Sequence, residues 1–130
     1  MSSQSNAPLK TILLLDAATC LLMGLLLATA SGFVCSITAL PQTLLFCAGI
    51  LLLPIGLFMA ATAIWWPGSA AAVWLIIVGN AGWVIASLGL LMIVTANGLG
   101  VVFVLAQALV VAVLAWVEYR ALRAGQAALA

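Results

Sequence analysis

Apolar residues run along this chain in four long stretches, and short polar or turn-forming segments separate them. A helix that crosses a hydrocarbon core about 30 Å thick needs about 20 consecutive apolar residues. The stretches reach that length at about residues 11–30, 43–64, 70–94 and 100–119. The pattern therefore predicts an all-α polytopic membrane protein. We expect an antiparallel bundle of four transmembrane helices that forms a single membrane domain over residues 1–130.

The segments between the stretches carry turn signals. Residues 31–42 form the first connection, Pro67-Gly68 lies in the second, and Asn97-Gly98 lies in the third. Pro and Gly at such positions favour turns. Because the second and third connections are short, we expect the second, third and fourth helices to pack as neighbours in chain order.

Small residues at helical spacing predict where the helices touch. Lipid tails are as apolar as Leu, so helices associate through close backbone approach and interhelical hydrogen bonds. Three helices carry such a stripe: Asp16, Cys20 and Gly24 on the first; Gly49, Gly56, Ala60 and Ala63 on the second; Gly79, Gly82, Ala86 and Gly89 on the third. We expect each stripe to face another helix.

The composition excludes several classes of protein. Hydrophobic residues make up 68% of the chain and charged residues 4%, whereas a soluble domain has about 25% charged residues. A net charge of +1 without a basic stripe argues against nucleic-acid binding. With no His and two acidic residues, we expect no metal site and no cofactor. No nucleophile stands beside a base, so we expect no enzyme.

The few basic residues indicate the orientation. Lys10, Arg120 and Arg123 are the only ones, and they lie outside the predicted spans at the two ends of the chain. An even number of spans and the positive-inside rule place both termini in the cytoplasm. Four tryptophans would then lie near the cytoplasmic boundary, where indole rings are enriched: Trp65, Trp66, Trp74 and Trp116.

A small set of polar residues lies within the apolar stretches. Asp16 is the only charged residue between Lys10 and Glu118, and an ionisable group inside a membrane segment is a functional-site hypothesis by default. Asn80 has a similar estimated depth, so we expect it to be hydrogen-bonded to Asp16 as the polar centre of the bundle. The candidate binding or proton-coupling residues are Asp16, Asn80, Gln107, Glu118, Trp83 and Ser87.

The polar residues of the fourth helix share one face. Gln107 and Glu118 are eleven residues apart, which is close to three full turns at about 3.6 residues per turn. We expect Glu118 near the headgroups and Gln107 deeper, on an edge that meets Asp16 and Asn80.

Two interpretations of Asp16 stay open. In the first, Asp16 is protonated or paired with Arg120, and the amides hold the helices together. In the second, Asp16 lies in a water-accessible cavity open to the cytoplasm and titrates during transport or ligand exchange.

The chain resembles a small bacterial inner-membrane protein family of four spans and unassigned function. Motifs in every helix carry the resemblance: Leu14-Leu15-Asp16-Ala17-Ala18, Ala48-Gly49-Ile50-Leu51-Leu52-Leu53-Pro54, Asn80-Ala81-Gly82-Trp83-Val84-Ile85-Ala86-Ser87, Phe103-Val104-Leu105-Ala106-Gln107-Ala108 and Glu118-Tyr119-Arg120. The resemblance implies a four-span fold and a location in the bacterial inner (plasma) membrane, and it implies no activity.

The chain is also similar in length and span number to small multidrug resistance transporters. These dimeric proteins exchange protons for cationic drugs at one acidic residue of the first helix. Here that residue is Asp16 rather than Glu, and the predicted loops lack charges.

The sequence thus favours a non-catalytic integral membrane protein. We expect it to bind a membrane lipid, an apolar small molecule, or a second copy or partner membrane protein through its helix faces. The alternative is a proton-coupled transporter of lipophilic cations with Asp16 as the coupling site.

Overall fold

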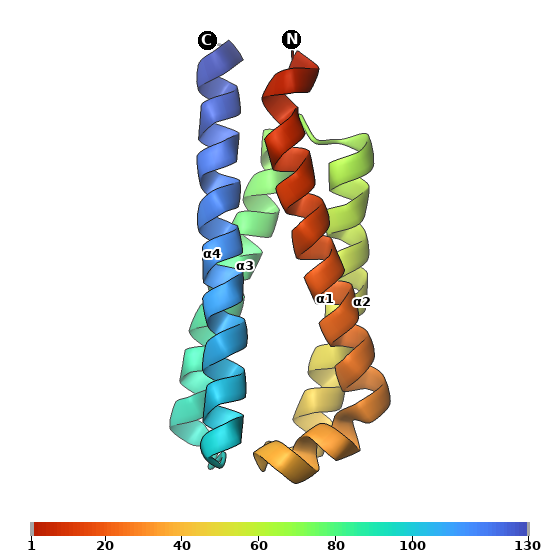
Figure 1. The fold of residues 1–130 in the computed structure, drawn as a ribbon, viewed down its shortest axis with the longest axis vertical. Coiled ribbons are helices and arrows are strands. Elements are labelled where there is room, and N and C mark those ends of the chain that lie inside the picture. The colour runs from red at the N-terminus through yellow and green to blue at the C-terminus, as the bar shows by residue number, and fades with distance from the viewer. Residues whose placement is uncertain (1, 130) are drawn as a thin grey trace.

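The protein forms four long helices in the computed structural model, which describes residues 2–129 and the side chains of residues 8–125. The helices are α1 (Ser2–Thr38), α2 (Gln42–Trp65), α3 (Ala70–Ile93) and α4 (Gly98–Leu129). They run antiparallel in chain order, and both termini lie at the same end of the bundle (Figure 1). Each helix is long and apolar enough to cross a membrane. The predicted all-α four-helix architecture is confirmed.

The helix bounds differ from the predicted spans mainly in α1. Residues 31–38, which the turn signals placed in a connection, continue as helix after a kink at Ala30 (φ −127°, ψ 27°). Beyond the kink, this segment crosses the end of the bundle toward the start of α4 (Figure 1). The Asn97 backbone N–H donates to Thr38 O (3.1 Å), and Asn97 Nδ2 donates to Ile37 O (2.9 Å). The end of α1 is thereby hydrogen-bonded to the turn between α3 and α4.

Ala39 ends α1 in a left-handed conformation, with φ 61°. Its N–H still donates to Cys35 O (2.9 Å), and the Leu40 N–H donates to Thr38 Oγ1 (3.3 Å). Pro41 then starts α2 at φ −60°, a value that its ring imposes. The first connection is therefore only three residues long, Ala39–Pro41.

The α1–α2 interface is a close backbone contact between small residues. A Cβ atom placed on Gly49 would lie 2.6 Å from Ala28 N and 2.9 Å from Gly24 O, and one on Gly56 would lie 2.8 Å from Leu21 Cγ. Only glycine permits this approach. The small-residue prediction is confirmed for α1 and α2.

The same prediction is wrong for α3. A Cβ atom on Gly79, Gly82 or Gly89 would meet nothing within 4 Å, and Ala86 is exposed. The expectation that α2 and α3 pack as neighbours is also wrong. The turn after Trp65 brings their ends together, but α2 packs on α1, α3 packs on α4, and α2 and α3 barely touch. The two helix pairs are joined through α1 and α4.

Candidate functional site

Three polar side chains from three helices meet in the half of the bundle nearer the termini. Asn80 Nδ2 on α3 donates to Asp16 Oδ2 on α1 (2.7 Å) and to Glu118 Oε1 on α4 (3.0 Å). Asp16 and Glu118 are 0% exposed and Asn80 is 5% exposed. We call these three residues the acid–amide cluster. The predicted hydrogen bond between Asp16 and Asn80 is confirmed.

Glu118 is fully buried inside the bundle, because α1 covers its face of α4. Its predicted place near the headgroups stays a prediction, since burial within the protein does not report depth in the membrane. Glu118 Oε1 accepts from the same amide nitrogen as Asp16 Oδ2, so the two carboxyls are close neighbours, while Oε2 has no donor among the described side chains. Two adjacent buried carboxylates repel each other strongly. A proton held between them would relieve that repulsion and supply the missing donor.

The pairing of Asp16 with Arg120, one of the two options in the first interpretation, is not present. Arg120 is exposed, two positions beyond Glu118 and therefore turned about 200° from it around α4. The groups that contact Asp16 are Asn80 and the Cys20 thiol, whose sulfur lies 3.9 Å from Oδ1. Across the side chains that the structure describes, no Lys or Arg forms an ion pair with either carboxyl.

The other predicted polar residues form a separate group farther from the termini. Trp83 Nε1 donates to Gln107 Oε1 (2.8 Å), and Gln107 Nε2 donates to Ser87 Oγ (2.9 Å) and to Val104 O (3.0 Å). Ser87 Oγ in turn donates to Trp83 O (2.8 Å). We call Trp83, Ser87 and Gln107 the indole–amide cluster. The expectation that Gln107 shares a polar edge with Asp16 and Asn80 is wrong, since eleven residues from Glu118 amount to about 16 Å along a helix.

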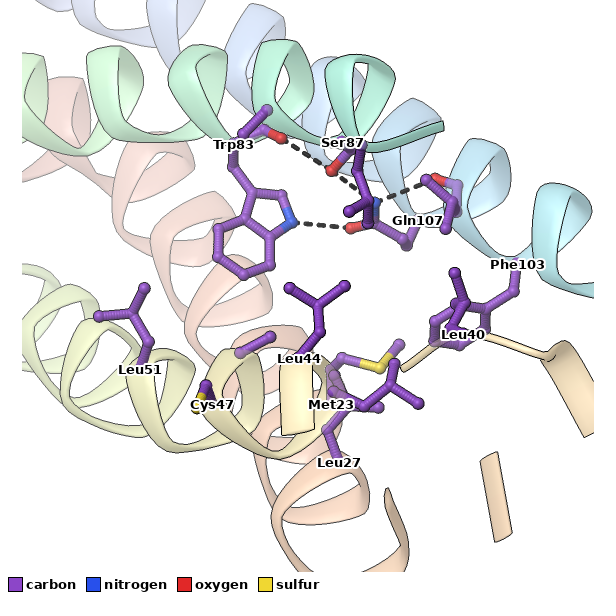
Figure 2. A pocket seen from close by; sticks show the side chains of 15 residues that line it. Met23, Leu27, Leu40, Leu44, Cys47, Leu51, Trp83, Ser87, Phe103 and Gln107 are labelled. Carbon is purple, nitrogen blue, oxygen red and sulfur yellow. Dashed lines mark hydrogen bonds between the residues drawn. The ribbon is translucent and has the colours of Figure 1, made fainter. Parts of the chain in front are cut away.

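Two apolar cavities lie between α2 and α3, where these helices separate. The distal cavity has a volume of about 340 Å³, and Figure 2 shows Trp83 pointing into it across from Leu44 and Leu51 of α2. The proximal cavity, nearer the termini, has a volume of about 360 Å³ and is lined by Asn80 and Cys20 as well as apolar side chains. Trp83 lines both cavities and therefore stands between them.

The two polar clusters border different cavities. The indole–amide cluster forms part of the wall of the distal cavity. Of the acid–amide cluster, Asn80 lines the proximal cavity. One interpretation placed Asp16 in a water-accessible cavity, but Asp16 is fully buried and lines neither of these two cavities. The sequence did not predict the cavities between α2 and α3, because they arise from the separation of these helices. One available signal was the small-residue stripe of α3, since Gly79 lines the proximal cavity and Ala86 the distal one.

Comparisons with protein-family models, curated proteins and solved structures find no match for this chain. The resemblance to a four-span bacterial family therefore stays a prediction.

Proposed function

We propose that this is a non-catalytic integral membrane protein that binds a lipophilic ligand, such as a lipid chain, in the groove between α2 and α3. The observation that supports the proposal is the pair of apolar cavities in that groove, each about 340–360 Å³. Ligand sites typically have volumes of about 300–1,000 Å³ and mostly apolar walls with a few placed polar groups. Both cavities meet this description.

The groove is reached from the lipid side of the bundle. Leu51 in the distal wall is 53% exposed, and Leu75 in the proximal wall is 63% exposed. These leucines belong to apolar membrane spans, so their open faces meet hydrocarbon rather than water. A ligand dissolved in the bilayer can enter sideways between α2 and α3 without crossing a polar barrier.

Trp83 provides a direct test of ligand binding in the distal cavity. A variant that keeps Trp83 and replaces the other four tryptophans by Phe, reconstituted in nanodiscs, is titrated with a brominated fatty acid. We expect saturable quenching of Trp83 fluorescence. Ala86→Leu, which fills the cavity, should weaken it, whereas Ala81→Leu on the exposed face of α3 should not. Quenching that rises linearly and equally in all three proteins would contradict the proposal.

We also propose that the protein is a multi-pass protein of the bacterial inner membrane with both termini in the cytoplasm. The aromatic side chains of the terminal end support this orientation. The rings of Trp74 and Tyr119 lie 5.6 Å apart, those of Trp116 and Tyr119 5.9 Å apart, and Arg123 lies 5.9 Å from the Tyr119 ring. Aromatic rings are typical of a membrane boundary, and the basic residues beside them favour the cytoplasmic one.

A second candidate is a proton-coupled transporter of lipophilic cations. The buried pair of Asp16 and Glu118 favours it, because two carboxyls bridged by one amide can hold and release a proton. The side chains that face them are Cys20 of α1 and Asn80 of α3, and neither is a cation. Ethidium uptake into proteoliposomes under an imposed pH gradient tests this function. Uptake should occur in the wild type and be lost in Asp16→Asn, and equal rates would contradict it.

A further inference from the structure

We infer that the proximal cavity binds a protonated lipophilic amine, and that its N–H donates to the side-chain oxygen Oδ1 of Asn80. This inference rests on the proposed binding of a lipophilic ligand and names the class of molecule that the proximal cavity selects. It follows from the orientation of one amide and from the charges behind it.

The Asn80 amide is oriented by its two acidic neighbours. Its nitrogen donates to Asp16 Oδ2 and to Glu118 Oε1, so both N–H groups are used. Oδ1 therefore points away from the carboxyls. It accepts no hydrogen bond from any side chain or backbone group described. It is also not fully enclosed by the protein. Because Asn80 lines the proximal cavity, Oδ1 is an acceptor open to a ligand there.

The charges behind Asn80 favour a cationic donor over a neutral one. Asp16 and Glu118 are both fully buried and have no basic partner among the described side chains. Even with one proton held between them, a negative charge remains one side chain away from the cavity. Its attraction for a cation is strong in an apolar medium of low dielectric constant. An ammonium group at Oδ1 would thus gain a hydrogen bond and a counter-charge together.

The rest of the proximal cavity suits an apolar body on that ammonium group. Its remaining wall is formed mainly by hydrophobic side chains, including Leu52, Ile55, Phe58, Met59, Ile76 and Val111. A hydrophilic amine would lose its hydration against these walls without compensation. The site therefore requires an N–H donor, a positive charge and an apolar tail in the same molecule.

Three ligands with the same octyl chain separate these requirements. N,N-dimethyloctylamine, protonated at neutral pH, carries both an N–H and a charge; octyltrimethylammonium carries only the charge; 1-octanol carries only a hydrogen-bond donor. Binding is followed by NMR of side-chain amides in nanodiscs labelled with ¹⁵N-asparagine, with empty nanodiscs correcting for partition into lipid. We expect the amine to bind at least tenfold more tightly than either comparator and to shift the Asn80 amide signal. Equal affinity of octyltrimethylammonium overturns the hydrogen bond, and equal affinity of octanol overturns the role of charge.

A variant that keeps the shape of the cluster completes the test. In Asp16→Asn/Glu118→Gln the amine should lose its advantage over octanol to within about twofold. The Trp83 quenching assay in the distal cavity is run on the same variant to show that it still binds a lipophilic ligand. An amine preference that survives in this variant overturns the inference alone. If the wild-type protein itself fails to bind the fatty acid in the Trp83 quenching assay, the proposed function is overturned.

Discussion

Asp16 on α1 and Asn80 on α3 are joined by a 2.7 Å hydrogen bond, although 64 positions separate them in the chain. The two helices run in the same direction from the terminal end of the bundle, so residues at equal depth can meet. Glu118 adds a second acceptor to the same amide nitrogen. Asn80 thereby connects the α1–α2 pair to the α3–α4 pair at a fully buried point.

The first prediction is an energetic coupling between Asp16 and Asn80. Asp16→Leu and Asn80→Leu should each lower the free energy of unfolding, measured by titration with SDS in mixed micelles. The double variant should lose less than the sum, by about 0.6–1.7 kcal/mol, which is the range from average to strongest for polar pairs between membrane helices. Strict additivity would show that the hydrogen bond contributes nothing to stability.

A second prediction contrasts two glycines that look alike in the sequence. Gly49→Leu should destabilise the protein by roughly 2 kcal/mol or more, because its Cβ would lie 2.6 Å from Ala28 N. Gly82→Leu should cause no loss of stability, since nothing lies within 4 Å of that position and replacing a helical glycine favours the helix by about 0.5–1 kcal/mol. Thermal unfolding in detergent measures both. Equal losses would mean that α3 is packed differently from the structure described here.

The third prediction concerns the side chain that separates the two cavities. In the variant whose only tryptophan is Trp83, Gln107→Leu removes the acceptor of the indole N–H, 2.8 Å away. The ring should gain mobility, seen as faster decay of its fluorescence anisotropy, and stability should fall by about 0.5–1.5 kcal/mol. Ser87→Ala is the control, because it leaves the bond between Trp83 and Gln107 intact. A ring equally immobile in Gln107→Leu would contradict the anchoring role.

The proposed orientation gives a fourth prediction. In a background without Cys20, Cys35 and Cys47, Ser36→Cys places a thiol on an exposed position beyond the kink of α1. An impermeant maleimide should label it in intact spheroplasts. Ala124→Cys, exposed near the other end of the bundle, should react only after lysis. The reverse pattern would invert the assignment of the termini.

The fifth prediction rests on the left-handed residue that ends α1. That conformation costs an ordinary L-residue about 1–2 kcal/mol, and glycine avoids the cost at the expense of about 0.5–1 kcal/mol of backbone freedom. Ala39→Gly should therefore raise the free energy of unfolding by about 0.5–1 kcal/mol, while Ala39→Val should lower it. Destabilisation by Ala39→Gly would mean that φ at position 39 is not positive, because glycine would then only add backbone freedom to the unfolded chain.

Hydrophobic length was enough to predict the four helices, and depth along each helix was enough to predict that Asp16 meets Asn80. Which helices pair could not be predicted from the small-residue stripe of each helix taken alone. The stripes of α2 and α3 have the same residue types, but only Gly49 and Gly56 face a partner that comes close enough to require glycine. The kink at Ala30 falls where the first predicted span ends, but the helix that continues beyond it to Thr38 was not predicted, because Ser31 and Gly32 indicate the start of a connection. The cavities depend on both of these features of packing.

The order of the helices along the chain has a consequence for biogenesis. During synthesis the α1–α2 interface can form as soon as these two helices have entered the bilayer. At that stage Asp16 still lacks its partners Asn80 and Glu118. Those partners emerge 64 and 102 positions later. The carboxyl must therefore wait protonated, hydrated at the membrane surface, or sheltered by the insertion machinery. Once α4 has inserted, Asp16 has both of its partners and no longer depends on protonation, surface water or the insertion machinery. Chains truncated before α4 should therefore be preferred substrates for membrane quality-control proteases.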